Sequence, residues 1–182
     1  MVKFLDKVIN ILDKFTNLIG GIAAVAMILM LLNVFYDVLM RYFFKNSSIG
    51  MQELEWHLFS IVFLFGMAYA LKEDGHVRVD MFYERMAPKK QALINIIGAF
   101  IFIIPFSLII LNTGFDFAHG AYEMGEISGD PGGLTNRWII KGAIATSFVF
   151  LLIATVSFIL KNGSIIFEAR TLEQHSHKDE VL

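Results

Sequence analysis

Hydrophobic residues along this chain are gathered into four long runs, and polar residues are concentrated in the stretches between them. The runs cover Leu18–Leu39, Leu54–Leu71, Leu93–Phe115 and Trp138–Leu160. Each is close to the roughly 20 residues that cross the hydrocarbon core of a bilayer as a helix. Helices are expected because every backbone amide in lipid has to be bonded within its own segment. The pattern predicts an all-α integral membrane protein with four transmembrane helices, at about 18–41, 52–72, 91–118 and 137–161.

Residues 1–17 carry a second pattern. Apolar side chains recur there at three- and four-residue steps, at Phe4, Leu5, Val8, Ile9, Leu12 and Phe15. Such a stripe, with lysines and aspartates opposite, predicts an N-terminal amphipathic helix lying in the membrane interface. A cytoplasmic extension of the first transmembrane helix fits the same pattern equally well. The chain is polar again from Glu168, so residues 162–182 are predicted to form a solvated, mobile cytoplasmic tail.

Lysine and arginine are distributed unevenly between the segments that separate the runs. One set of segments holds Lys3, Lys7, Lys14, Lys72, Arg78, Arg85, Lys89, Lys90, Lys161, Arg170 and Lys178, and the other holds Arg41, Lys45, Arg137 and Lys141. Because basic residues concentrate on the cytoplasmic side of membrane proteins, this asymmetry predicts that both termini lie in the cytoplasm. Four crossings likewise require both termini to lie on the same side of the membrane.

Composition agrees with a membrane protein and excludes several other classes. Hydrophobic residues make up 56% of the 182 residues and the mean hydropathy is +0.62, whereas about 45–50% apolar residues is usual in soluble domains. The net charge of −2 gives no basic excess for nucleic acid, and a sequence without cysteine has no disulfides or thiolate sites. No phosphate-binding loop, zinc-protease, serine-hydrolase or dinucleotide motif is present, so we expect neither enzymatic activity nor a cofactor.

Charged residues at the ends of the runs are the first candidate functional residues. Asn33, Asp37 and Arg41 are four apart and form one stripe, so Asp37 can pair with Arg41. This stripe is interpreted either as an ion relay or as a pair that anchors the helix end or docks a neighbouring subunit. Glu53 and His57 share one face of the second helix. A contact between helices or subunits is favoured there over proton carriage.

Aromatic and basic residues at the helix ends are predicted to anchor the helices at the membrane surface. Trp56 fits the interfacial aromatic belt, and Arg137, Trp138 and Lys141 form a similar set at the start of the fourth helix. The preceding Pro131-Gly132-Gly133 predicts a tight turn. The acidic residues before that turn are a candidate docking surface.

Two further features of the connections and the third run are informative. Residues 74–80 alternate polar and apolar side chains, as an extended segment does, which would project His76, Arg78 and Asp80 to one side. Because arginine is a poor metal ligand, a structural loop is favoured over a metal site.

Pro105 lies in the middle of the third run and predicts a kink.

Six blocks of sequence carry a resemblance to a known family. They are Arg41-Tyr42-Phe43, Gln52-Glu53-Leu54-Glu55-Trp56-His57-Leu58-Phe59, Phe65-Gly66-Met67-Ala68-Tyr69, Asp74-Gly75-His76-Val77-Arg78-Val79-Asp80, Gly129-Asp130-Pro131-Gly132-Gly133-Leu134 and Arg137-Trp138-Ile139-Ile140-Lys141. In this order, over about residues 18–160, they resemble the small permease (Q-type) subunit of tripartite ATP-independent periplasmic (TRAP) transporters. The last two blocks are similar to the branch labelled for mannitol or chloroaromatic compounds.

The resemblance implies a non-catalytic scaffold subunit in the inner, or cytoplasmic, membrane of a bacterium or archaeon. It would pack in the lipid bilayer against a large TRAP membrane subunit that carries the substrate and sodium sites. A periplasmic substrate-binding protein would deliver the solute, usually an organic acid. Two other classes remain open: a stand-alone proton-coupled carrier or channel that uses Asp37, Glu53 and Asp116, and a membrane anchor of a redox enzyme.

Overall fold

The computed structural model describes residues 2–75, 83 and 85–179. Its helices are α1 (Val2–Phe43), α2 (Ile49–Lys72), α4 (Pro88–Gly98), the five-residue π-helix η1 (Ala99–Ile103), α5 (Ile104–Glu123) and α6 (Trp138–Asp179). Over these residues, four helical stretches are long and apolar enough to cross a membrane: Phe4–Phe43, Ile49–Lys72, Pro88–Glu123 and Trp138–Phe167. The predicted all-α fold with four membrane spans is confirmed.

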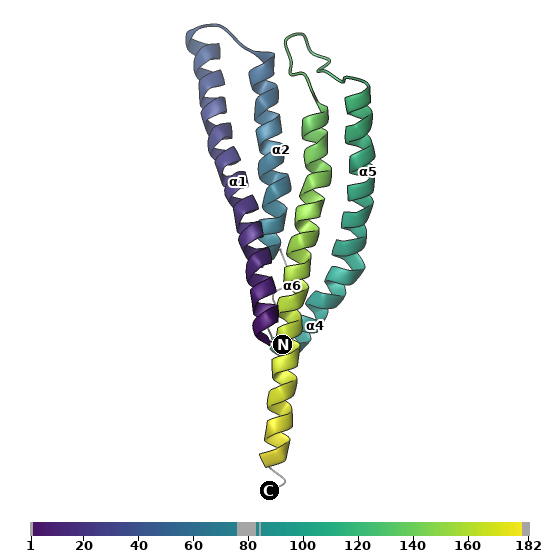
Figure 1. The fold of residues 1–182 in the computed structure, drawn as a ribbon. Helices are drawn as coiled ribbons and strands as arrows, with labels where there is room; N and C mark the ends of the chain where they lie inside the picture. The colour runs from purple at the N-terminus through teal and green to yellow at the C-terminus, as the bar shows by residue number, and fades with distance from the viewer. Residues whose placement is uncertain (1, 76–82, 84, 180–182) are drawn as a thin grey trace.

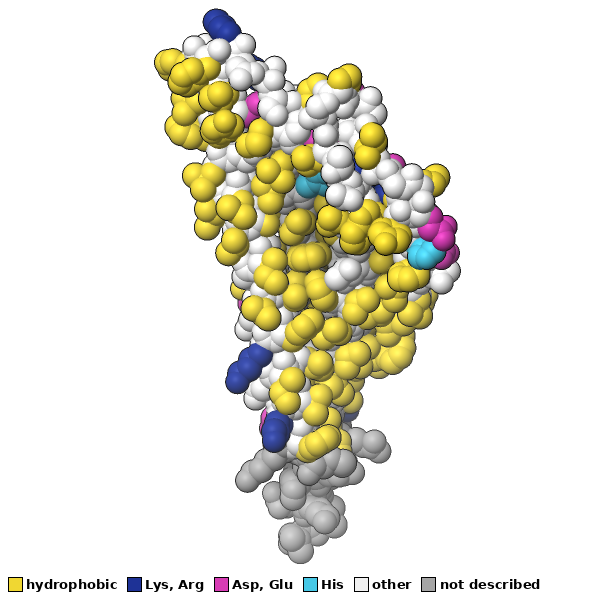
Figure 2. All heavy atoms as spheres, turned by 45° about the horizontal axis from the view of Figure 1, so that its top comes forward, with side chains coloured by type: hydrophobic (Ala, Val, Ile, Leu, Met, Phe, Trp, Pro, Cys, Tyr) yellow, Lys and Arg dark blue, Asp and Glu magenta, His cyan; other side chains and the backbone are white. Residues whose placement is uncertain are grey.

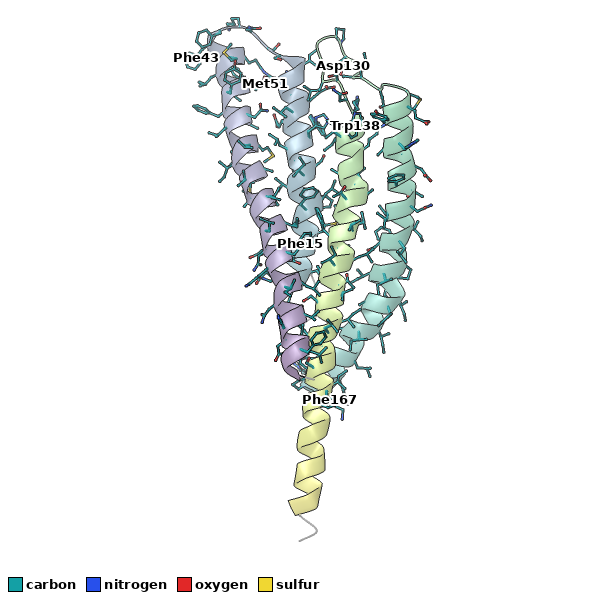
Figure 3. All side chains as sticks on the ribbon, in the orientation of Figure 1. Phe15, Phe43, Met51, Asp130, Trp138 and Phe167 are labelled. Carbon is teal, nitrogen blue, oxygen red and sulfur yellow. The ribbon has the colours of Figure 1, made fainter. Side chains whose placement is uncertain are left out.

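The helices stand in an open row, which Figure 1 shows from the side. α1 packs along α2, α2 along α6, and α6 along α5, while α4 and part of α1 also pack on α6. The helices lie closest together at the end where the chain begins and diverge towards the opposite end (Figure 1). We call the diverging end, with residues 44–48 and 124–137, the loop end, and the opposite end the terminal end. Figure 3 labels Phe43 and Asp130 at the loop end and Phe167 towards the terminal end.

The buried core is small and lies where α2 meets α6. Ala68, Leu71 and Ala154 are buried together. The ring of Phe150 is in edge contact with Phe15, at 5.6 Å between centroids, and with Phe65, at 5.1 Å. Most of the large apolar side chains on the spans are exposed, and Figure 2 shows them spread over one face of the row. Such a surface fits lipid or another membrane subunit.

The first helix runs without a break from Val2 to Phe43. Of the two arrangements left open for residues 2–15, the structure therefore has the extension of the first span. Leu5, Val8, Leu12 and Phe15 are half-buried, so their apolar stripe packs on neighbouring helices. Whether this part of α1 lies at the membrane interface stays a prediction.

Residues 162–179, which were predicted to be a tail, continue α6 as a helix. Six of the seven residues at 168–174 are glutamate, alanine, arginine, leucine or glutamine, all of which have good helix propensity. Figure 1 shows this part of α6 projecting beyond the ends of the other helices. Its position in the cytoplasm stays a prediction.

Hydrogen-bonded caps set the start of α2 and the end of α5. The Ser48 side chain accepts a hydrogen bond from the Met51 N–H at 3.4 Å, so α2 starts three residues earlier than hydropathy predicted. Gly125, with φ of +58°, ends α5. The Gly125 N–H donates to the Tyr122 carbonyl at 3.0 Å and the Glu126 N–H to that of Ala121 at 2.9 Å, the pattern of a Schellman cap.

The third span is interrupted before Pro105. In η1 the Ile104 N–H donates to the carbonyl of Ala99, five residues earlier. Proline has no N–H, and its ring crowds the carbonyl four residues before it, so the wider π-turn relieves that contact. Figure 1 shows the chain changing direction between α4 and α5. The predicted kink is present and starts one turn ahead of the proline.

Candidate functional site: a clamp on the loop between α5 and α6

The Glu53 carboxylate joins the first turns of α2 to the loop at residues 124–137. One carboxylate oxygen accepts a hydrogen bond from the Ser128 hydroxyl, and the other accepts the Leu134 N–H at 2.6 Å. Both donors belong to the loop, more than 70 residues further along the chain. We call this set, Glu53, Ser128 and Leu134, the loop clamp. Its three members lie at the loop end, although Glu53 is far from the other two in the sequence.

The loop between these contacts is itself a tight turn. The Gly133 N–H donates to the Asp130 carbonyl at 3.0 Å, and Gly132 has φ of +84°. With Pro131 before it, Gly132 stands where a type II turn requires a left-handed residue. The Ser128 N–H also donates to the Leu134 carbonyl at 3.0 Å. The turn predicted from Pro131-Gly132-Gly133 is confirmed, and the clamp holds it against α2.

A second set of contacts, around Glu126, fixes the start of α6 to the same loop. The Glu126 carboxylate forms an ion pair with Lys141, and the Arg137 Nε lies 3.9 Å from it. The Lys141 ammonium also lies 3.9 Å from the ring centroid of Phe117. The Arg137 N–H donates to the Glu126 carbonyl at 3.2 Å. Arg137 and Lys141 are therefore engaged with protein, and their role as membrane anchors stays a prediction.

Trp138 packs at the junction of α5 and α6. Its ring meets Tyr122 edge-on at 5.5 Å between centroids, and its side chain is partly exposed. Trp56, by contrast, is 74% exposed on α2. An exposed tryptophan near a helix end is typical of an interfacial belt, and this role of Trp56 stays a prediction.

Asp37 and Arg41 form the predicted ion pair on α1. Asp37 is buried, whereas the Arg41 side chain is half exposed. Asn33, one turn before Asp37, donates from its side-chain amide to the Met51 carbonyl at 2.8 Å. The polar stripe of α1 therefore faces the first turn of α2. This geometry makes Asn33 a contact between two helices of this chain, an arrangement that neither interpretation of the stripe anticipated, and the role of Asp37 and Arg41 as an anchor or a docking pair stays a prediction.

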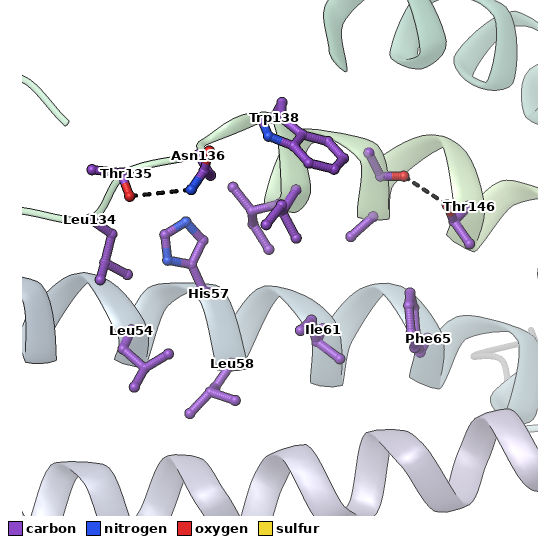
Figure 4. Close-up of a pocket in the computed structure, with 14 residues that line it drawn as sticks. Leu54, His57, Leu58, Ile61, Phe65, Leu134, Thr135, Asn136, Trp138 and Thr146 are labelled. Atoms are coloured by element: carbon purple, nitrogen blue, oxygen red, sulfur yellow. Dashed lines mark hydrogen bonds between the residues drawn. The ribbon is translucent and has the colours of Figure 1, made fainter. Parts of the chain in front are cut away.

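His57 lies on the same helix as Glu53 but faces a different environment. It lines an apolar cavity of about 560 Å³ between α2 and α6, which begins directly beside the clamped loop. Figure 4 shows His57 between Leu134 and the start of α6, with Leu54, Ile61 and Phe65 along the wall. Its Nδ1 atom is buried without a hydrogen-bond partner in the described part of the chain. Both residues therefore lie beside Leu134, Glu53 bonded to its N–H and His57 in the apolar cavity that its side chain lines.

His76, Arg78 and Asp80 lie outside the described residues, so the predicted loop at 74–80 keeps its status as a prediction. Among the residues that are described, no group of three or more histidine or acidic side chains could hold a metal ion. His119, the other histidine near the loop end, lines a second cavity between α5 and α6.

Sequence reasoning did not identify Ser128, Glu126 or the Leu134 N–H as partners of the candidate residues. One signal was available, because Glu53 and the Gly129–Leu134 segment both belong to the blocks that carried the resemblance. Their contact depends on how α2 and the loop meet in space. No local pattern in a single sequence predicts which residues of α2 and the loop come into contact.

Comparison with known proteins covers the region that holds these contacts. The profile of the family described as the DctQ component of tripartite ATP-independent periplasmic transporters matches residues 30–162. A Haemophilus influenzae protein described as a putative TRAP transporter small permease protein is 30% identical over 135 residues, covering 73% of this chain and 84% of that protein. The resemblance seen in the sequence blocks is thereby confirmed at the level of the family.

Proposed function

This chain belongs to the DctQ-component family of tripartite ATP-independent periplasmic transporters, and we propose that it is the small scaffold subunit of a sodium-coupled, binding-protein-dependent importer. The partners would be a large membrane subunit and a periplasmic substrate-binding protein, with no nucleic acid involved. The solute would be an organic acid or a similar small molecule. The two sequence blocks at residues 129–141 support assignment to the branch labelled for mannitol or chloroaromatic compounds.

The observation that carries the scaffold role is the open row of helices. A carrier has to enclose its substrate near the middle of the membrane and alternate its access. Here α6 is the helix that joins the others, and the large apolar side chains of the row are mostly exposed. A row of this kind has two broad faces for packing against lipid or a larger subunit. Substrate and sodium would then be bound by the large subunit, and this chain would need no cofactor and no catalytic residue.

The loop clamp supports the same role. Two sets of contacts, from Glu53 and from Glu126, hold the connection between α5 and α6 in one shape. A fixed loop costs less conformational entropy when another protein docks on it. We propose that this loop faces the periplasm, where the binding protein approaches, and that both termini lie in the cytoplasm. The excess of lysine and arginine in the segments of the terminal end supports this orientation.

The contacts of the acidic side chains weigh against the alternative of a stand-alone proton carrier. Asp37 is paired with Arg41, and the Glu53 carboxylate is occupied by two donors of the loop. Asp116 is exposed on α5, at the other edge of the row from α1. These three carboxylates therefore form no relay through the protein. For a redox anchor, His57 and His119 line different cavities and do not face each other across one site.

The proposal is tested by reconstitution. The chain is expressed alone and together with a large TRAP subunit and its binding protein, and uptake of labelled organic acids and mannitol is measured in liposomes with and without a sodium gradient. We expect the two membrane subunits to co-purify and uptake to require all three proteins and sodium. Uptake by this chain alone at the rate of the full system, or failure of the membrane subunits to co-purify, would contradict a scaffold role.

A further inference from the structure

A stripe of polar side chains lies on the exposed side of α1, near its beginning. Lys7, Asn10 and Lys14 follow one another at steps of three and four residues, so they share one face of the helix. All three are exposed. With Asp6 and Ile11 they line a shallow hollow of about 460 Å³ on the surface of the helix. We call Lys7, Asn10 and Lys14 the lysine stripe.

Packing fixes the direction in which the lysine stripe points. The opposite side of the same turns carries the half-buried Leu5, Val8, Leu12 and Phe15. Phe15 contacts Phe150 of α6 ring to ring, at 5.6 Å between centroids. Because this side is held against the row, the lysine stripe is directed away from the other helices.

The nearby acidic residues leave the lysine charges largely unopposed. Asp13 is turned towards α6, where it accepts a hydrogen bond from Ser157 at 2.7 Å and pairs with Lys161 at 2.7 Å. Its charge is thus balanced within the protein. Among the described residues that line the hollow, Asp6 is acidic, against two lysines. The hollow keeps a net positive charge that is complementary to an anion.

The position of the lysine stripe relative to the first apolar run indicates which kind of anion it binds. The first apolar run begins at Leu18, four residues after Lys14, which is a distance of about 6 Å along a helix. Headgroup layers occupy roughly this distance beyond the hydrocarbon on each side of a bilayer. Helical side chains lean towards the N-terminus, so the Lys14 ammonium is directed away from the apolar run.

Two exposed apolar side chains beside the lysine stripe also fit a phospholipid. Ile11 is 58% exposed inside the hollow, and Leu18 is 62% exposed one turn beyond Lys14. A water-soluble acidic protein would gain little from these two side chains. A phospholipid would place its phosphate near the lysines and its acyl chains along Leu18. Figure 2 shows basic side chains at the lower edge of the visible face, next to the apolar region.

We propose that Lys7, Asn10 and Lys14 bind the phosphate headgroup of an anionic phospholipid in the leaflet at the terminal end. Ammonium groups bind phosphate oxygens through charge-assisted hydrogen bonds, and the Asn10 amide adds a neutral donor. The bound lipid would hold α1 at a fixed depth in the membrane. This inference requires membrane insertion only, and it does not depend on which solute is transported or on which partner is bound.

Lipid-dependent stability of the full chain tests the proposal. The protein is purified from membranes in an uncharged detergent, and its Tm is followed by tryptophan fluorescence as phosphatidylglycerol or phosphatidylcholine with the same acyl chains is added. The variants are K7Q/K14Q, the charge-conserving K7R/K14R, and K45Q, which removes an exposed lysine at the loop end. Inorganic phosphate and polyglutamate are added in separate experiments as a free anion and an acidic peptide.

We expect phosphatidylglycerol to raise the Tm of the unmodified chain, K45Q and K7R/K14R, and phosphatidylcholine to raise it less. In K7Q/K14Q, the concentration of phosphatidylglycerol needed for half of the effect should increase by roughly tenfold or more, given about 1 kcal/mol per lysine near an anionic surface. An equal effect of phosphatidylcholine, or an unchanged response of K7Q/K14Q, would overturn the proposal. Equal stabilisation by inorganic phosphate or by polyglutamate would also overturn it, in favour of a free anion or an acidic protein.

A measurement on the unmodified chain covers the case in which K7Q/K14Q does not fold. Sodium chloride at about 0.5 M screens exposed charges over a few ångströms. It should therefore reduce the effect of phosphatidylglycerol on Tm and leave the effect of phosphatidylcholine unchanged. Insensitivity to salt would contradict an electrostatic headgroup site.

Discussion

Glu53 has both oxygens of its carboxylate occupied by one loop. The Ser128 hydroxyl and the Leu134 N–H donate to it, and both are fixed by the backbone of the turn between them. Each of the two carboxylate oxygens is therefore engaged in a contact with the loop. At the scale of single residues, we interpret Glu53 as the residue of α2 that positions the loop.

Replacing Glu53 by glutamine should loosen that loop. The glutamine side chain is neutral, so the charge-assisted bonds from Ser128 and Leu134 would be replaced by weaker neutral ones. We expect Glu53→Gln to lower Tm and to make the segment at residues 124–137 severalfold more sensitive to limited proteolysis. Glu55→Gln is the matched control, because Glu55 is an acid of the same helix two residues away.

The two variants separate a specific contact from a general effect of charge. If Glu53→Gln and Glu55→Gln had the same Tm and the same proteolytic pattern, the clamp would not hold the loop. Proteolysis that increased elsewhere in the chain, and not at residues 124–137, would also contradict the clamp.

Gly133 provides an independent test of the same turn. A Cβ atom at this position would overlap the Ser128 side chain and lie 2.8 Å from the Glu53 Oε2. We expect Gly133→Ala to lower the free energy of unfolding by about 1–3 kcal/mol, the usual cost of overpacking. Gly129→Ala is the control, since nothing lies within 4 Å of its added Cβ. Thermal unfolding of both variants in detergent measures the difference, and equal Tm values would show that the turn is not closely packed.

At the scale of helices, the close approach of α1 and α2 depends on one of two adjacent glycines. A Cβ on Gly20 would lie 2.8 Å from the Cγ of Tyr69, whereas a Cβ on Gly21 would have nothing within 4 Å. Small residues allow transmembrane helices to approach in this way. Which of the two adjacent glycines faces α2 is seen only in the structure.

Gly20→Ala and Gly21→Ala should therefore have opposite effects on stability. The first should destabilise the protein by about 1–3 kcal/mol through overpacking. The second should be neutral or stabilising by up to about 1 kcal/mol, because alanine is the better helix former. Unfolding monitored by circular dichroism in detergent compares them directly. A Gly21→Ala variant less stable than Gly20→Ala would show that α1 presents a different face to α2.

Hydropathy predicted the four spans because the bilayer imposes a strong and local constraint on composition. It did not predict the ends of helices, where Ser48 and Gly125 cap the chain through specific hydrogen bonds. The Asp37–Arg41 pair was predictable since both residues lie on one helix at a fixed spacing. The contact of Glu53 with Ser128 was not, since it joins residues 75 positions apart through packing of the whole row.

At the scale of the whole molecule, the polar contacts between helices are distributed over both ends of the row. At the terminal end, Asp13 of α1 bonds to Ser157 and Lys161 of α6, and the Asn95 amide of α4 donates to Asn162 at 2.8 Å. At the loop end, Glu53 and Glu126 fix the connection to α6. The middle relies on small and aromatic side chains. Such a row is joined firmly at its ends while its faces stay free for a partner.

The direction of the row across the membrane can be tested with cysteine labelling, because the sequence contains no cysteine of its own. Lys45→Cys and Gly129→Cys place a thiol at the loop end, and Lys7→Cys and Lys90→Cys place one at the terminal end, all at exposed positions. In cells whose outer membrane has been removed, a membrane-impermeant maleimide should label the first two variants directly. The last two should be labelled only after the cytoplasmic membrane is permeabilised.

This pattern follows from the charge distribution of the two ends. Lys7, Lys14, Arg85 and Lys90 are exposed at the terminal end, whereas at the loop end Arg41 and Lys141 are paired with acids and Lys45 is exposed. The excess of exposed basic residues predicts that the terminal end stays in the cytoplasm. The reverse labelling pattern would place the clamped loop in the cytoplasm. It would remove the loop from reach of a periplasmic binding protein while leaving the clamp itself intact. Labelling therefore separates the proposed orientation from the proposed structure of the loop.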